Sequence, residues 1–202
     1  MEEILNQALE FDVPIMQEEG IKFLINFIKE NNIKNIFELG SAIGYSAINM
    51  ALISNDIEIT TIERDTFRYS LAVSNINKFN LEKQITIIND DVFNFEVSKN
   101  YDLVFIDAAK AQNTKFFEKV ANNTKYIITD NLSFHGLVED ESLAVTRNQR
   151  GLVGTSIDIK SRNLRGLVRK IENYIEFLKS NKEFETKFYQ IGDGIAVSKK
   201  II

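Results

Sequence analysis

The sequence predicts an α/β fold built around one mostly parallel β-sheet. Strand-like and helix-like stretches alternate before residue 125, and the strand-like stretches are short and apolar. The composition, with 44% hydrophobic and 26% charged residues, is that of a globular protein, which excludes disordered and fibrous architectures. Because 202 residues suit one domain, we expect residues 1–202 to form a single domain.

Five short stretches are rich in β-branched and aromatic residues, and each ends in a polar residue or glycine, which is typical of strands in a covered sheet. They are Asn35–Gly40, Glu58–Glu63, Ile85–Asp90, Tyr101–Asp107 and Tyr126–Asn131. Helical periodicity fills the intervals between them. The predicted helices are Ile15–Lys29, which follows the only proline, Pro14, and Tyr45–Leu52, Thr66–Phe79 and Asn113–Val120.

The carboxyl-terminal part predicts a helix followed by a hairpin. Apolar residues at three- and four-residue spacing define an amphipathic helix over Leu164–Leu178. Two alternating runs, Thr186–Ile191 and Ile195–Lys199, are joined by Gly192-Asp193-Gly194 and indicate a β-hairpin. The hairpin requires one antiparallel strand at the end of the sheet, as in class I methyltransferases and unlike most dinucleotide dehydrogenases.

Absent residue types narrow the chemistry. The chain has no cysteine and a single histidine, His135, which excludes disulfides, thiolate zinc sites and multi-histidine metal cages. The amino terminus has no signal-peptide pattern, and no apolar run approaches the roughly 18 residues that span a bilayer. We expect a soluble, cytoplasmic protein without membrane contact.

The net charge of −5 conceals a basic segment. Between Arg147 and Lys170 the charges amount to +6, so the remainder of the chain carries −11. Arg162, Arg165 and Arg169 share one helix face, opposite the apolar stripe. Cations at the start of a helix oppose its dipole, so they indicate a polyanion partner, while a solvated face is the alternative interpretation. Residues 132–160 are expected to form a mobile loop beside a metal site at Asp130 and Asn131, where the loop could gate a substrate.

The first candidate site is the turn Glu38-Leu39-Gly40-Ser41-Ala42-Ile43-Gly44, between a strand and a helix. Gly40 lets the backbone approach a ligand, and Gly44 permits tight packing of helix on strand. Ala42 replaces the middle glycine of the dinucleotide fingerprint, which favours a ligand without phosphates. An ordinary strand-to-helix turn is the alternative.

Polar residues end the next two predicted strands. Glu63 stands where a carboxylate can accept hydrogen bonds from both hydroxyls of a ribose. Asn89, Asp90 and Asp91 end the third strand, near the expected place of an adenine. Singly these are polar strand ends, but together with the glycine turn they predict an adenosine site. S-adenosylmethionine (SAM) fits this combination.

Two further strands end in Asp107 and Asp130-Asn131. Two carboxylates and an amide oxygen form a hard ligand set that suits Mg²⁺ and does not suit zinc. Lys110, three residues after Asp107, can reach over such a metal. Helix caps and loop turns are the alternative for these residues, and His135 could either orient a ligand or serve surface packing.

Four stretches resemble a known family. FELGSAIGYSAINMA, YDLVFIDAAK, ITDNLSFHGLV and IGDGIAVSKK are similar to bacterial members of the cation-dependent O-methyltransferase family, relatives of catechol and caffeoyl-CoA O-methyltransferases. The similarity runs from about Pro14 to Lys200. Within the family, it is greatest to the bacterial branch that methylates 5-hydroxyuridine to 5-methoxyuridine at the wobble position of tRNA.

The resemblance implies a Rossmann-like, class I SAM-dependent methyltransferase fold: a mostly parallel seven-stranded sheet with a C-terminal antiparallel hairpin. It also implies a homodimer. Asp107, Asp130 and Asn131 would bind Mg²⁺. Lys110 matches the general base, although Ala109 departs from the commoner IDADK pattern, and Asp107 would serve catalysis beside it. The expected cofactor-binding residues are Gly40, from the turn, and Met16, Ser46, Glu63, Asp91 and Asp107, from the resemblance.

The expected activity is SAM- and Mg²⁺-dependent methylation of 5-hydroxyuridine in the anticodon region of tRNA, with Arg162, Arg165 and Arg169 holding RNA phosphates. The nearest alternative keeps the chemistry and replaces the acceptor by a small catechol or hydroxycinnamoyl compound. A non-catalytic RNA partner that binds SAM or a nucleotide is a hypothesis from a different class. A dehydrogenase comes third, because Ala42 and the closing hairpin disfavour it.

Overall fold

The computed structural model describes residues 1–133 and 162–201. His135 and nearly all of the predicted loop 132–160 lie outside the described residues. The chain begins with α1 (Glu2–Glu10) and α2 (Glu18–Glu30), which precede the first strand. The remaining helices are α3 (Tyr45–Ala51), α4 (Thr66–Lys78), α5 (Asn113–Val120) and α6 (Arg162–Ser180), with 3₁₀ turns η1 (Lys110–Gln112) and η2 (Ala121–Asn123).

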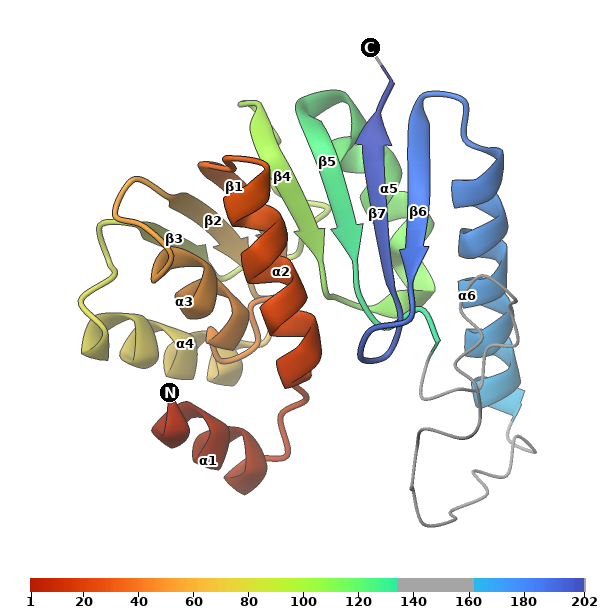
Figure 1. The fold of residues 1–202 in the computed structure, drawn as a ribbon. Coiled ribbons are helices and arrows are strands. Elements are labelled where there is room, and N and C mark those ends of the chain that lie inside the picture. Colours follow the sequence, from red (N-terminus) through yellow and green to blue (C-terminus); the bar gives the residue numbers. More distant parts are fainter. Residues whose placement is uncertain (134–161, 202) are drawn as a thin grey trace.

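Seven strands form one sheet in the order β3-β2-β1-β4-β5-β7-β6 (Figure 1). The strands are β1 (Asn35–Leu39), β2 (Glu58–Ile62), β3 (Ile85–Ile88), β4 (Tyr101–Ile106), β5 (Thr124–Thr129), β6 (Phe184–Tyr189) and β7 (Ile195–Lys200). The first five run parallel, and β7 is antiparallel to both β5 and β6. The predicted fold class, including the antiparallel C-terminal hairpin, is confirmed.

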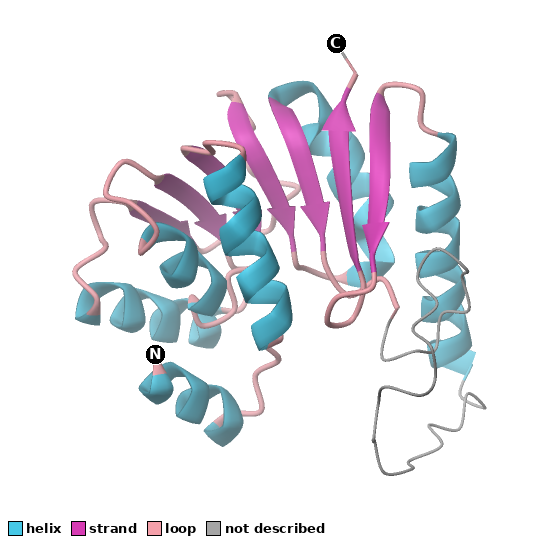
Figure 2. Cartoon of the chain, viewed as in Figure 1, coloured by secondary structure: helices cyan, strands magenta, loops and turns pink. Residues whose placement is uncertain are grey.

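Helices cover both faces of the sheet, as Figure 2 shows, because successive strand residues point in opposite directions. Ile36 of β1 packs in a cluster with α1, α2, α3 and α4, and its neighbour Phe37 packs in a second cluster with α5 and α6. The apolar stripe of α6 supplies Ile171, Tyr174 and Leu178 to this second core. The sheet is thus packed on both faces by a buried apolar cluster, which fixes the positions of its strand ends.

The chain order reverses direction between β1 and β4, which is where ligands bind in open α/β sheets. The carboxyl ends of β1 to β5 all lie at this edge. The turn between β6 and β7 lies there too, because β7 is antiparallel to β5. The sheet therefore brings five strand ends and one hairpin turn to the same place.

The structure shifts some predicted boundaries. Helix α2 begins at Glu18 rather than Ile15, because Gln17 has extended backbone angles and caps the helix. Helix α1 was not predicted: its apolar face is short, with Ile4 and Ala8 as its buried residues. Several predicted strands end one or two residues early, since their terminal polar residues turn into the edge loops.

No helix among the described residues is long and apolar enough to cross a membrane.

Candidate active site

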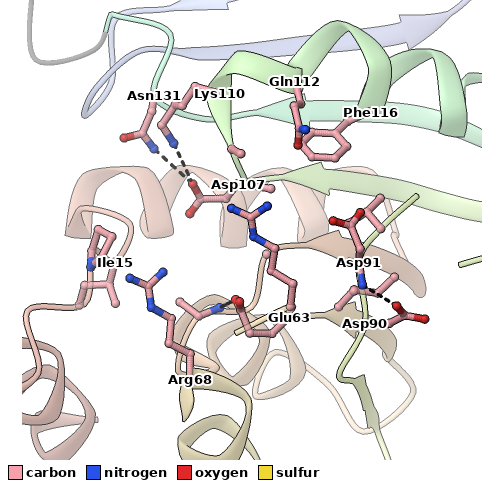
Figure 3. A pocket seen from close by; sticks show the side chains of 18 of the residues that line it. Ile15, Glu63, Arg68, Asp90, Asp91, Asp107, Lys110, Gln112, Phe116 and Asn131 are labelled. Atoms are coloured by element: carbon pink, nitrogen blue, oxygen red, sulfur yellow. Dashed lines mark hydrogen bonds and ion pairs between the residues drawn. The ribbon is translucent and has the colours of Figure 1, made fainter. Parts of the chain in front are cut away.

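A cleft of about 620 Å³ opens at the carboxyl edge of the sheet. The ends of β1, β2, β4 and β5, the loop after β3 and the segment before α2 line it (Figure 3). Its polar lining includes Glu63, Asp90, Asp91, Asp107, Lys110 and Asn131. Residues from four separate sequence stretches, all predicted as site residues, therefore share one cavity.

Gly40 brings the ends of β1 and β4 together at the floor of the cleft. Its φ is +95°, and a Cβ atom at this position would stand 2.4 Å from the backbone oxygen of Asp107. The Gly40 N–H donates to the carbonyl oxygen of Ile62 at 3.0 Å, which joins β1 to β2 beyond the regular ladder. Only glycine fits this backbone, so the role of Gly40 in the site is to let the chain after β1 pass close to the backbone of Asp107.

Glu63 is buried at the end of β2 with its carboxylate fixed by two backbone groups. Oε2 accepts from the N–H of Ala42 at 2.9 Å, and Oε1 accepts from the N–H of Asp65 at 2.8 Å. Each oxygen keeps acceptor capacity for a further donor, as two ribose hydroxyls require. The glycine turn and the acid thus form one hydrogen-bonded unit.

Asp90 and Asp91 line one end of the cleft with the buried ring of Phe116. Asp91 accepts from the N–H of Phe93 at 2.9 Å, and Asp90 accepts from the N–H of Asp91 at 2.7 Å. Asn89 instead lies outside the cleft lining and donates to the carbonyl oxygen of Glu63 at 2.8 Å. This end offers an aromatic wall and carboxylate acceptors, which suit a purine with an amino group.

The other end of the cleft carries the predicted metal ligands. Oδ1 of Asp107 lies 3.3 Å from Nζ of Lys110 and 3.4 Å from Nδ2 of Asn131 (Figure 3). Asp130 is buried next to them and lines a small adjoining cavity of about 20 Å³ together with Asn131. The structure thus places Asp107, Lys110, Asp130 and Asn131 together.

Burial, together with the neighbouring charge of Asp107, raises the pKa of Asp130 to about 7. Two carboxylates held close at a buried edge repel each other, and a cation between them would relieve the repulsion. Among the described residues, no group of three or more His, Cys, Asp or Glu side chains could hold a metal ion. The predicted ligand set instead combines the two carboxylates with the side-chain amide of Asn131. This all-oxygen donor set fits Mg²⁺.

Two predicted cofactor residues do not line the large cleft. Met16 is buried and lines the small adjoining cavity. Ser46 is buried in α3, where its hydroxyl donates to Oε1 of Glu38, while Thr61 donates to Oε2 of the same carboxylate at 2.6 Å. Burial raises the pKa of Glu38 to about 7 despite these hydrogen bonds. Contact of Met16 or Ser46 with a cofactor stays a prediction.

The structure adds residues that the sequence patterns did not identify. Asp193, in the turn between β6 and β7, lines both cavities, and its carbonyl oxygen accepts from the N–H of Ser133 at 2.7 Å. The antiparallel placement of β7 beside β5 was the available signal, since it puts this turn at the site edge. Arg64 and Arg68 also line the cleft.

The predicted RNA-binding arginines lie in α6. Arg165 and Arg169 are exposed, and Arg162 is the first residue of the helix. Helix α6 packs against η1, which contains Lys110, and it begins at the edge where β4 and β5 end (Figure 1). Arg147, Arg150 and Lys160 lie outside the described residues.

Comparisons with known proteins show which chains this one is similar to. A family model described as O-methyltransferase matches residues 1–201. The solved structure of a proposed caffeoyl-CoA O-methyltransferase from Staphylococcus aureus is 37% identical, with 99% of this chain and 91% of that chain covered and a TM-score of 0.84. An O-methyltransferase from Bacillus cereus, solved in complex with SAH, is 24% identical over 98% of this chain and 90% of that chain, with a TM-score of 0.76.

A caffeoyl-CoA O-methyltransferase from Populus kitakamiensis is 26% identical over 201 residues. That match covers 94% of this chain and 78% of the plant protein. The family model, which matches residues 1–201, includes both ends of the cleft and the C-terminal hairpin.

Proposed function

The chain belongs to the O-methyltransferase family, and we propose that it methylates the 5-hydroxyl group of 5-hydroxyuridine in the anticodon region of tRNA, with Mg²⁺ at Asp107, Asp130 and Asn131. It is an O-methyltransferase that uses SAM as methyl donor. The observation that carries the proposal is the single cleft in which an adenosine-type half and an all-oxygen metal half adjoin, with Lys110 beside Asp107.

Methyl transfer from SAM needs an oxyanion placed in line with the electrophilic methyl carbon and the sulfur. When bound, Mg²⁺ supplies Lewis acidity that makes the acceptor hydroxyl easier to ionise. Lys110 Nζ lies 3.3 Å from Asp107 Oδ1. From there, a neutral Lys110 amine can take the hydroxyl proton, and a charged Lys110 ammonium can stabilise the oxygen anion. Glu63 and the Gly40 turn hold the donor, so the chain's own residues align the reacting atoms.

The basic face of α6 supports an RNA acceptor. Arg165 and Arg169 are exposed cations on a helix that packs against η1, close to the metal half. An anticodon base is unpaired and can leave its stack to enter a cleft, while basic side chains hold the neighbouring phosphates. A homodimer remains part of the proposal, and its mass in solution is the direct check.

Mass spectrometry of tRNA nucleosides from a strain that lacks the protein tests the acceptor. We expect 5-hydroxyuridine to accumulate and 5-methoxyuridine to disappear, and complementation with the intact gene should restore the profile. An unchanged nucleoside profile would contradict the proposal.

Charge reversal at Arg165 and Arg169 tests the RNA surface. The double variant R165E/R169E should bind tRNA more weakly and with a smaller salt dependence, while SAM affinity stays unchanged. K29E/K83E is a matched control, since it changes the net charge equally at exposed residues on the opposite edge of the sheet. Equal salt dependence in both double variants would assign the arginines to a solvated face.

A small phenolic acceptor is the second candidate, because similar proteins are described as caffeoyl-CoA O-methyltransferases. Turnover of a catechol or hydroxycinnamoyl-CoA by the purified protein, together with an unchanged tRNA profile, would favour it. Metal-dependent turnover of either acceptor would exclude a non-catalytic SAM-binding RNA partner.

A further inference from the structure

Arg68 is a half-buried cation in the wall of the cleft. It lies in the first turn of α4, where its backbone N–H is capped by Asp65 at 2.9 Å. Within residues 1–133 and 162–201, its guanidinium has neither a hydrogen-bond partner nor an ion-pair partner. A partly desolvated guanidinium without a partner is costly, which indicates that a bound anion completes this wall.

The position of Arg68 shows which part of a ligand it would meet. In Figure 3 its guanidinium faces Ile15, on the side of Glu63 away from Asp91. A ligand with its ribose at Glu63 and its adenine toward Asp91 directs its 5′ substituent to this side. In SAM that substituent is the methionine part.

The charges around the cleft indicate which group of SAM would lie against Arg68. Glu63, Asp90, Asp91, Asp107 and Asp193 surround the cleft and suit the cationic sulfonium and ammonium groups of SAM. The α-carboxylate is the anionic group of SAM, and it needs a cation against these acids. Ser46, a cofactor contact that the family resemblance implies, already donates to Glu38. Arg68 also lies at the amino end of α4, where the helix dipole favours an anion.

We propose that Arg68 binds the α-carboxylate of SAM as a guanidinium–carboxylate ion pair. The ion pair makes the cleft select adenosine ligands that carry an intact amino-acid tail over those without the carboxylate. This inference rests on the use of SAM and is independent of the acceptor. Arg64 lines the same wall but is exposed, so water screens its charge.

Decarboxylated SAM, which lacks only the carboxylate, is the matched probe. Isothermal titration of the purified chain should show that the wild type binds SAM at least about tenfold more tightly than decarboxylated SAM. R68Q should lower SAM affinity by about 10- to 100-fold and leave the affinity for decarboxylated SAM unchanged, because a hydrogen-bonded charge is lost from one ligand only. R68K should recover part of the selectivity.

R64Q is the control variant, since it removes the same charge from the same wall and should keep the selectivity for the carboxylate. Equal weakening of both ligands by R68Q would assign Arg68 to a structural role. Unchanged SAM affinity together with weaker tRNA binding would assign Arg68 to the acceptor, and either result overturns the inference. A wild type that binds SAM without discriminating against decarboxylated SAM overturns the inference alone, whereas failure to bind SAM overturns the cofactor assignment as well.

Discussion

The two halves of the cleft are held in opposite ways. In the adenosine half, the Glu63 carboxylate accepts two backbone N–H groups at 2.9 and 2.8 Å. In the metal half, Asp107 has contacts of 3.3 Å to Lys110 and 3.4 Å to Asn131, and Asp130 is buried beside it. The first half is pre-organised by the chain itself, whereas the second gathers like charges that a cation would balance.

Strand register explains the difference. Ile106 of β4 pairs with Thr129 of β5, so the residues that follow, Asp107 and Asp130, leave the sheet side by side. At the end of β2, by contrast, the turn after β1 supplies the Ala42 N–H and the loop after β2 supplies the Asp65 N–H, and both donate to Glu63. The acidic residues of both halves thus stand at equivalent strand ends of a parallel sheet. The halves differ because neighbouring loops supply backbone N–H donors to the carboxylate in only one of them.

Removing Asp130 should have the largest effect, because it takes a proposed ligand from the half that depends on a cation. Loss of a residue that only hydrogen-bonds to a metal ligand lowers activity by roughly 10- to 100-fold. Asp130→Ala removes a proposed ligand itself, so it should lower methyl transfer by more than this, while SAM affinity changes little. Turnover and SAM titration on the same preparation measure both effects. Full turnover in EDTA, or in this variant, would remove the metal from the mechanism.

Gly40 joins the two halves, so its substitution should disturb both. Gly40→Ala places a Cβ atom 2.4 Å from the Asp107 carbonyl oxygen at a φ of +95°, which should lower the free energy of unfolding by about 2 to 4 kcal/mol. Denaturant titration measures this. Gly44→Ala is the control: its φ is +85°, but its Cβ would meet Ala72 at an ordinary 3.5 Å. We expect Gly44→Ala to lower the free energy of unfolding by about 1 kcal/mol. Equal losses in the two variants would mean that the close approach of Gly40 to Asp107 does not matter for stability.

Glu63→Ala should weaken the adenosine half alone. Loss of hydrogen bonds between two ribose hydroxyls and a carboxylate should reduce SAM affinity by about 10- to 100-fold. Metal affinity measured without SAM should not change, because Asp107 and Asp130 do not contact this side chain in the described hydrogen bonds. Weaker metal binding in the variant would show that the halves are coupled and would break the comparison.

The sequence predicted most of the sheet because strand residues carry their own signal. Short runs rich in β-branched and aromatic residues defined β1 to β5, and acidic residues at strand ends located both halves, since parallel strands end at one edge. The sequence patterns did not identify Arg68 or Asp193 as site residues. The place of Arg68 depends on the direction of its side chain, and that of Asp193 depends on the antiparallel pairing of β7. The Ser46 environment likewise required knowledge that Glu38 is buried and accepts its hydroxyl.

A change at Glu38 should have the smallest effect on the cleft, because this side chain is buried beneath the site. Burial, together with the charges of Asp107 and Glu63, one from each half, raises its pKa from 4.5 to about 7. Between these values the unfolded chain loses the proton while the folded chain keeps it, so folding stability falls as pH rises, by about 3 kcal/mol at 1.36 kcal/mol per pKa unit.

Glu38→Gln removes this titration and keeps a side chain that can hydrogen-bond to Ser46 and Thr61. The variant should therefore gain on the order of 2 to 3 kcal/mol in unfolding free energy relative to wild type between pH 4.5 and pH 8, with most of the gain complete above pH 7. Denaturant titrations of both proteins across that range measure the gain. Parallel stability curves would mean that folded Glu38 ionises as it does in the unfolded chain, so that neither half of the cleft acts on it.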